Sequence, residues 1–176
     1  MNAPLLERLR AAVRDVPDFP KPGIVFKDIT PVLGDAALLR EVVEALAEAT
    51  RPLAVTKIVG IESRGFIFGA AVAVALGVGF VPVRKKGKLP WTCEAVSYAL
   101  EYGEATVEIH RDAIRPGERV VVIDDLLATG GTAAAAIELV RRLGGEIAEV
   151  QCVIELGFLN GRQLLPGVEV RALISY

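Results

Sequence analysis

The hydrophobic and polar positions of this chain follow two spacings, and each spacing predicts a different kind of element. Two early segments place apolar residues at helical intervals with charges between them, which predicts amphipathic helices over residues 4–16 and 36–49. Short apolar runs predict buried strands at residues 57–61, 80–83, 119–123, 147–154 and 168–174. A further helix is expected over residues 132–143, where a glycine pair ends it.

Strands and helices alternate along most of the chain. This order is typical of a mostly parallel, twisted sheet flanked by helices, and therefore of the α/β class. In such sheets, ligands bind beyond the carboxyl ends of the strands. Residues 65–83 carry no charge, but their glycines and Pro82 favour a buried helix and strand over a membrane span. Ser63 stands where it can cap that helix.

Two segments interrupt the alternation. Residues 17–23 are rich in proline and predict a break. Residues 85–104 are polar and irregular, and they predict a long flexible loop or hood. An exposed hairpin is predicted near the end of this hood. Its two arms are residues 98–100, inside the hood, and residues 106–109, just after it. Because no linker is visible, we expect a single domain over residues 1–176.

Composition narrows the possible partners. The chain is 52% apolar and 24% charged, which is typical of a globular protein. Its net charge of -2 gives no general attraction to nucleic acid or to an anionic membrane, so neither partner is expected. Cys93 and Cys152 are isolated, which argues against a disulfide framework or a zinc site. With no signal-peptide pattern at the start, a soluble cytoplasmic protein is expected.

The segment Val-Val-Ile-Asp-Asp-Leu-Leu-Ala-Thr-Gly-Gly-Thr, residues 121–132, carries the clearest chemistry. A buried strand leads into a turn of small residues that opens a helix. Backbone N–H groups of such a turn and of a first helical turn can surround a phosphate, helped by the helix dipole. This predicted phosphate loop consists of Ala128, Thr129, Gly130, Gly131 and Thr132, and its threonines add hydroxyl donors.

The adjacent carboxylates of Asp124 and Asp125 would repel that phosphate, so they are expected to face another group. Ribose hydroxyls suit them, because a carboxylate accepts hydrogen bonds from a diol. A Mg²⁺ ion carried by the substrate is another suitable partner. The segment lacks the Gly-Lys-Ser/Thr of a Walker loop, and its glycines follow the acidic residues, opposite to a dinucleotide fingerprint. An acidic strand end with a tight turn does not account for all of these residues together.

The segment resembles the signature of type I phosphoribosyltransferases, which bind 5-phosphoribosyl 1-pyrophosphate (PRPP). Further segments, in the same order along the chain, are similar to adenine phosphoribosyltransferases. These are Phe-Pro-Lys-Pro-Gly-Ile-Val-Phe-Lys-Asp-Ile-Thr-Pro from residue 19, Gly-Ile-Glu-Ser-Arg-Gly-Phe from 60, Arg-Lys-Lys-Gly-Lys-Leu-Pro from 84, and Ser-Tyr-Ala-Leu-Glu-Tyr-Gly from 97. The similarity spans nearly the whole chain.

The resemblance implies the type I phosphoribosyltransferase fold, with a small N-terminal and hood region. It implies a purine salvage enzyme, a pentosyl-transferring glycosyltransferase that converts adenine and PRPP to AMP and pyrophosphate. Mg²⁺ is expected to act with PRPP and to be held mainly by the substrate, so no metal-binding residues are expected in the chain. A homodimer is also implied. The base-recognition segment falls at about residues 17–31 and the hood at about 85–104.

The resemblance also implies residue roles. Phe26 stacks on the purine and the Val25 backbone contacts the purine edge. Ser63 and Arg64 bind pyrophosphate, and so does the basic cluster, which the family shares across subunits. From that cluster we select Arg84, Lys85 and Lys88, whereas Lys86 is assigned to solvent. In the hood, Tyr102 binds substrate. The catalytic set is Glu101, Arg64, Asp124 and Asp125.

Alternatives stay open for several of these residues. Phe26 also fits a core position, the basic cluster a solvated loop, and Glu101 an exposed hairpin carboxylate. At the level of function, the acceptor could be another base, such as xanthine, guanine or orotate. A non-enzymatic regulator that senses PRPP and binds DNA is a third class. It requires a DNA-binding segment, for which this chain leaves no room.

Overall fold

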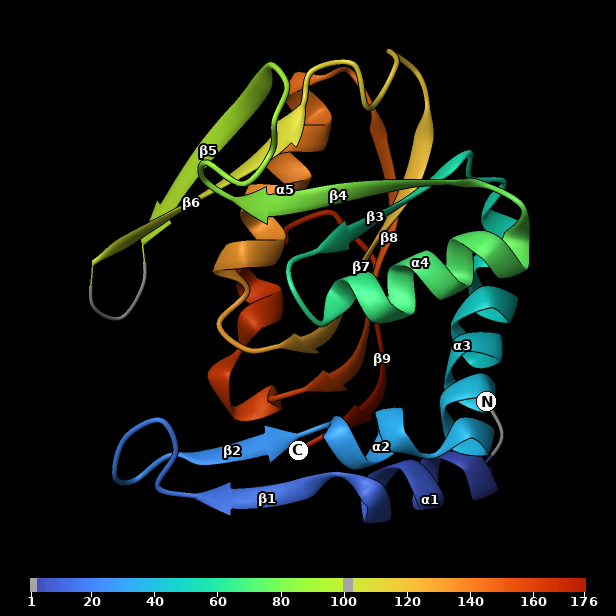
Figure 1. The fold of residues 1–176 in the computed structure, drawn as a ribbon, viewed down its shortest axis with the longest axis vertical. Helices are drawn as coiled ribbons and strands as arrows, with labels where there is room; N and C mark the ends of the chain where they lie inside the picture. The colour runs from blue at the N-terminus through green and yellow to red at the C-terminus, as the bar shows by residue number, and fades with distance from the viewer. Residues whose placement is uncertain (1–2, 100–102) are drawn as a thin grey trace. The chain divides into compact units, whose positions relative to one another are not determined.

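The computed structural model describes residues 3–99 and 103–176. The described residues divide into two compact units, with the boundary between Ala45 and Leu46. The N-terminal unit contains helices α1 (Ala3–Ala12) and α2 (Thr30–Gly34) and strands β1 (Arg14–Pro17) and β2 (Val25–Asp28). The two strands pair antiparallel (Figure 1). In their register, Val16 is the partner of Phe26. Helix α3 (Ala36–Thr50) begins in this unit and ends in the next.

The first predicted helix is shorter than expected. It ends at Ala12, and residues 14–17 form β1 instead. A proline disfavours helical conformation in the residue before it, and the extended segment gains backbone partners in β2. The predicted break at residues 17–23 is the turn of this hairpin. There, the backbone N–H of Gly23 donates to the Asp18 carboxylate at 2.8 Å, and the Phe19–Pro20 peptide is cis.

The C-terminal unit is built on a seven-stranded sheet of order β5-β6-β4-β3-β7-β8-β9 (Figure 1). Strand β3 pairs parallel with β4 and β7, and β7, β8 and β9 continue the parallel pairing. Only the β4–β6 and β5–β6 pairings of this sheet are antiparallel among the residues described. Its strands are β3 (Lys57–Ile61), β4 (Gly79–Lys85), β5 (Cys93–Ala99), β6 (Glu104–His110), β7 (Arg119–Leu127), β8 (Glu146–Glu155) and β9 (Val170–Ser175).

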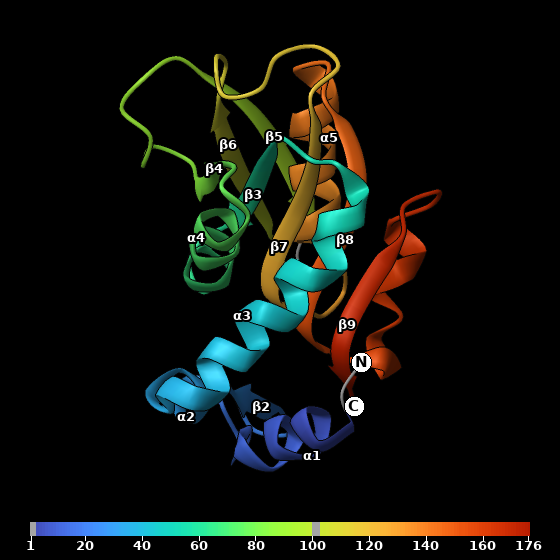
Figure 2. The ribbon, with the colours of Figure 1, turned by 90° about the vertical axis from the view of Figure 1, so that its right-hand side faces the viewer.

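Helices α4 (Gly65–Leu76) and α5 (Gly131–Arg142) cover opposite faces of this sheet (Figure 2). On β3, Val59 and Ile61 join the core beneath α5. The alternate residues Ile58 and Gly60 lie against α4, where Gly69 packs closely. No helix in the described part of the chain is both long and apolar enough to cross a membrane. Short 3-10 helices lie at Arg51–Leu53, Gly157–Leu159 and Gly161–Leu164.

The predicted hood is more regular than a loop. Strand β4 extends to Lys85, and β5 forms a continuous antiparallel ladder with β6, pairing Val96 with Val107. Alternating half-buried and exposed side chains along β5 explain this, because one face of the strand packs on the core. Arg142 of α5 stabilises the ladder, since it forms ion pairs with Glu94 of β5 and with Glu138 of its own helix. Residues 100–102 lie outside the described residues.

Candidate active site

The two aspartates lie near the carboxyl end of β7, which runs four residues beyond its predicted end. Asp125 is 5% exposed, and its carboxylate accepts a hydrogen bond from Nε of Arg64. Asp124 is half-buried, and its Oδ1 accepts the backbone N–H of Asp125 at 2.8 Å. A Cβ on Gly65 would lie 2.8 Å from Asp124 Oδ1, so a glycine there lets α4 begin directly beside the pair. The structure therefore places Arg64 and both aspartates together.

The electrostatics of this pair are uneven. Burial, together with the adjacent charge of Asp125, raises the pKa of Asp124 well above its usual range. The Asp125 N–H and the Arg64 cation act in the opposite direction but are outweighed. A carboxylate in this position gains from hydrogen-bond donors that stabilise its charged form. Ribose hydroxyls are donors of that kind.

The predicted phosphate loop connects β7 to α5, as the sequence indicated. Helix α5 begins at Gly131, and the Ala134 N–H donates to the Gly130 carbonyl at 2.9 Å. Gly130 has a φ of +87°, a conformation that favours glycine. The Thr132 hydroxyl donates to the Tyr98 hydroxyl of β5 at 2.9 Å, so the hood strand contacts this loop. A Cβ on Gly131 would lie 3.1 Å from the Tyr98 ring, which explains the need for a small residue there.

Gly161 supports the loop from the other side, a contact that sequence reasoning missed. A Cβ on Gly161 would lie 2.2 Å from the Ala128 carbonyl oxygen. A Cβ on Gly130 would in turn lie 2.3 Å from the Gly161 carbonyl oxygen. Two backbones therefore touch where only glycines fit. The local sequence carries one usable signal, because Asn160 with Gly161 is typical of a turn.

Ser63 and Arg64 lie between β3 and α4, and the Glu62–Ser63 peptide is cis. Ser63 does not cap α4 as predicted. Arg64 occupies the N-cap position in helical conformation without a side-chain cap hydrogen bond. An N-cap side chain needs an extended backbone to reach the first-turn amides, and Ser63 stands one residue too early.

The basic cluster gathers around Glu62, which the sequence analysis left without a role. Lys88 Nζ donates to Glu62 Oε1 at 2.7 Å, and Arg84 Nε donates to Oε2 at 3.3 Å. The Lys85 backbone N–H also donates to Oε2, at 3.0 Å. Lys86 is exposed, in keeping with its assignment to solvent.

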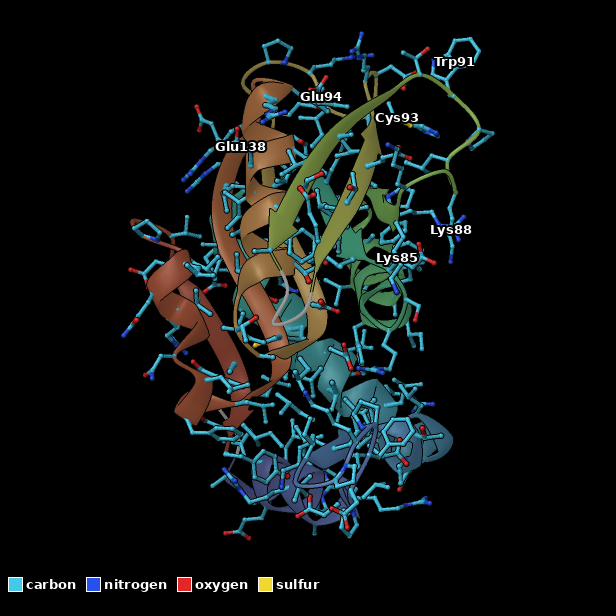
Figure 3. The ribbon with its side chains drawn as sticks, turned by 90° about the vertical axis from the view of Figure 1, so that its left-hand side faces the viewer. Lys85, Lys88, Trp91, Cys93, Glu94 and Glu138 are labelled. Carbon is cyan, nitrogen blue, oxygen red and sulfur yellow. The ribbon has the colours of Figure 1, made fainter. Side chains whose placement is uncertain are left out.

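One pocket of about 550 Å³ brings together seven of the predicted site residues of this unit. It is lined by Glu62, Ser63, Arg64, Lys85, Lys88, Tyr98, Val107, Asp124, Asp125, Leu126 and Thr132. A smaller cavity of about 80 Å³ adjoins it and is lined by Ala128, Thr129, Gly130 and Gly131, among others. Figure 3 shows Lys85 and Lys88 close together beside β4. Arg84 does not line either cavity, and reaches the pocket through Glu62.

The remaining predicted residues belong elsewhere. Val25 and Phe26 lie on β2 of the N-terminal unit, where Val25 is 50% exposed. Phe26 is half-buried, and its ring meets the Phe19 ring edge-on with centroids 5.2 Å apart. Glu101 and Tyr102 fall outside the described residues.

Fold and site together define a phosphoribosyl transferase domain, and residues 34–162 match the family model of that description. An adenine phosphoribosyltransferase from Nocardioides sp. is 57% identical over 99% of this chain and 96% of its own length. A crystal structure of the Rhodothermus marinus adenine phosphoribosyltransferase is 57% identical, covers 99% of this chain and 100% of its own, and superposes with a TM-score of 0.95.

A third relative was solved with ligands. The adenine phosphoribosyltransferase from Saccharomyces cerevisiae, complexed with an imino-altritol bisphosphate and adenine, is 44% identical with a TM-score of 0.93. That similarity covers 98% of this chain and 100% of the yeast chain. The chain belongs to the adenine phosphoribosyltransferase family. The family and fold predicted from the sequence are thereby confirmed.

Proposed function

We propose that this chain is a purine salvage enzyme that transfers the 5-phosphoribosyl group from PRPP to adenine, giving AMP and pyrophosphate. One observation carries the proposal beyond family membership. The acidic pair, the phosphate-loop residue Thr132 and the cations of Arg64 and Lys88 all line a single pocket. That arrangement has donors for a phosphate, acceptors for sugar hydroxyls and positive charge for a leaving pyrophosphate.

In the proposed mechanism, a purine nitrogen attacks the anomeric carbon of PRPP as the bond to pyrophosphate breaks, and the base loses its ring N–H proton to solvent. Positive charge grows on the sugar, and negative charge grows on the leaving group. Asp124 and Asp125 accept hydrogen bonds from the ribose hydroxyls and stabilise the sugar cation. Arg64, Lys85 and Lys88 face the leaving group, where fixed positive charge stabilises the transition state. Ser63, exposed beside them, adds a hydroxyl donor.

Magnesium is part of this proposal as a companion of PRPP. In the described part of the chain, no group of three His, Cys, Asp or Glu residues could hold a metal ion. The two pocket carboxylates, Asp124 and Asp125, suit an ion that takes its remaining ligands from the substrate and water. When bound, Mg²⁺ supplies charge neutralisation at the pyrophosphate.

The hood, residues 85–104, is proposed to close over the pocket and exclude water, which would otherwise hydrolyse PRPP. The contact between Tyr98 of β5 and Thr132 supports this assignment, because the hood already touches the phosphate loop. The catalytic role of Glu101 and the binding role of Tyr102 stay predictions. So do the single domain, the homodimer and the cytoplasmic location.

A nucleobase panel tests the proposal directly. Purified protein is incubated with PRPP, Mg²⁺ and one base at a time, from adenine, guanine, xanthine and orotate, while nucleotide and pyrophosphate are quantified. We expect AMP and pyrophosphate in equal amounts when the base is adenine, and no nucleotide with the other bases. Turnover with only one of the other bases would show that this base, and not adenine, is the acceptor. No turnover with adenine would reject the function.

The stacking role of Phe26 predicts a selective defect. Phe26→Ala should raise the KM for adenine about tenfold, because an aromatic face under a base contributes about 1–3 kcal/mol. The KM for PRPP should change less than about twofold. Phe19→Ala is the matched control, since it removes the same ring–ring contact without removing the proposed platform. Equal increases in both KM values would contradict the stacking role.

A further inference from the structure

An acidic side chain, Glu62, lines the pocket where a polyanion is expected to bind. Its side chain is only 9% exposed. Taken alone, a carboxylate there would repel pyrophosphate and weaken the proposed site. The contacts of Glu62 point to a different effect.

The carboxylate of Glu62 accepts hydrogen bonds from three residues of one short segment, residues 84–88, at the end of β4 and in the turn after it. Lys88 Nζ donates to Oε1 at 2.7 Å, while Arg84 Nε and Nη2 lie 3.3 and 3.4 Å from Oε2 and Oε1. The Lys85 backbone N–H completes the set at 3.0 Å. Burial acts to raise the pKa of Glu62, but the hydrogen bonds from Lys88, Lys85 and Arg84 lower it to about 2. Glu62 is therefore a stable anion that meets two cations, and the cluster keeps net positive charge.

The sheet register explains why these groups meet. Strands β3 and β4 pair in parallel up to Ile61 opposite Val83, and the Glu62 N–H donates to the Val83 carbonyl at 2.9 Å. Glu62 therefore follows β3 directly beside Arg84, near the end of β4. Arg84 Nη1 also donates to the Lys88 carbonyl at 3.0 Å, which closes the turn on itself.

The far side of the same turn is fastened to β6. The Lys86 N–H donates to the Thr106 carbonyl at 3.1 Å, and the Gly87 N–H donates to the Glu108 carboxylate at 2.9 Å. On the pocket side, the same segment is held by its hydrogen bonds to Glu62. Lys88 lines the pocket together with Ser63 and Arg64, and its ammonium group donates to Glu62 there.

We propose that Glu62 is a positioning residue that holds the cations of the 84–88 turn against the Ser63–Arg64 segment, so that the pyrophosphate-binding side is formed before substrate arrives. This inference rests on the proposed function for its ligand. It predicts that removing the negative charge weakens the binding of an anion. If the carboxylate merely repelled the ligand, removing its charge would strengthen the binding of the anion.

The test uses Glu62→Gln in the full chain, with two readouts. Isothermal titration calorimetry measures the Kd of inorganic pyrophosphate with Mg²⁺, and steady-state assays measure the KM for each substrate. We expect the pyrophosphate Kd and the PRPP KM to rise about tenfold, because charged hydrogen bonds that order two cations are lost. The KM for adenine should stay within about twofold. Unchanged or tighter pyrophosphate binding would overturn the inference.

Glu118→Gln is the matched control. Like Glu62, Glu118 accepts a hydrogen bond from a lysine side chain, Lys57 Nζ at 2.6 Å. It also accepts one from a backbone N–H, that of Arg115 at 2.7 Å. Glu118 lies just before β7, at the amino end of that strand, whereas the pocket is lined by residues near its carboxyl end. It should lower thermal stability about as much as Glu62→Gln while leaving the pyrophosphate Kd unchanged. A pyrophosphate defect of equal size in this control would show that Glu62 acts only through stability.

A shorter acid provides a second variant if Glu62→Gln does not fold. Glu62→Asp keeps the charge but cannot span the same donors, so its pyrophosphate Kd should lie between wild type and the values expected for the amide. A Kd equal to that of wild type would contradict positioning by geometry. Calorimetry needs no turnover, so it separates this inference from the proposed reaction. Wild type that binds pyrophosphate but converts no base rejects the reaction alone, whereas wild type that binds no pyrophosphate rejects the role of Glu62.

Discussion

Replacing Asp124 and Asp125 together by asparagine is expected to lower kcat/KM for PRPP by about 10²-fold or more, as is usual when charge placed for a transition state is lost. Asparagine keeps the shape of both side chains and part of their hydrogen bonding. It removes the negative charge beneath a sugar that becomes cationic during transfer. Because the cation exists only in the transition state, most of the loss should appear in kcat.

Unfolding is the competing explanation for such a loss, and Asp124 gives a way to separate the two. Its folded-state pKa is raised, so its contribution to stability is present at low pH and is lost as pH rises through the folded value. Asparagine cannot ionise and avoids that loss. Asp124→Asn alone should therefore unfold at or above the wild-type Tm at neutral pH, with a gain of about 0.5–2 kcal/mol typical of stabilising changes.

Thermal melts from acid to neutral pH, paired with steady-state kinetics, check both statements. Asp112→Asn is the control, since that exposed aspartate lies outside both cavities. It should change neither kcat/KM nor Tm appreciably. A double variant that retains wild-type kcat/KM would reject the ribose role of the pair. A less stable Asp124→Asn protein at neutral pH would contradict the electrostatic account.

The phosphate loop and the acidic pair were predictable because their chemistry is local. A buried strand, two aspartates and a turn of glycine and threonine follow one another within residues 121–132, and the structure keeps that order. Helical and strand spacings likewise located the elements of the parallel sheet. Two segments differ from their predictions. Residues 14–17 have a helical pattern but pair with β2 as a strand. Part of the predicted hood forms the end of β4 and the strand β5.

Residues that act through distant partners were not predictable in this way. Glu62 belongs to the Gly-Ile-Glu-Ser-Arg-Gly-Phe segment that was used for the family resemblance. Its hydrogen-bond partners lie at the end of β4 and just after it. The parallel register of β3 and β4 brings them together. Tyr98 meets Thr132 because the hood folds as a ladder over α5. Gly161 meets the phosphate loop through a connection after β8. These contacts depend on strand order, which hydrophobic spacing does not encode.

The glycine contact leads to a second large effect. Gly130→Ala should lower kcat/KM for PRPP by about 10²-fold, because displacing a binding loop by about 1 Å can cost that much. The added Cβ would lie 2.3 Å from the Gly161 carbonyl oxygen, so one of the two backbones must move. One of these two backbones is the loop whose N–H groups are proposed to bind the 5′-phosphate, and the other supports it. The KM for PRPP should rise, while that for adenine changes little.

Gly117→Ala separates this steric effect from conformational strain. Gly117 has a φ of +81°, close to the +87° of Gly130, but a Cβ there meets nothing within 4 Å. It should therefore show only the cost of the left-handed backbone, about 1–2 kcal/mol of stability, with normal kinetics. Gly161→Ala provides the reciprocal case, because its Cβ would press on the Ala128 carbonyl at 2.2 Å without a positive φ. If the loop contact matters for phosphate binding, Gly130→Ala and Gly161→Ala share the PRPP defect and Gly117→Ala lacks it. Normal PRPP kinetics in both loop variants would show that the two glycines serve packing alone.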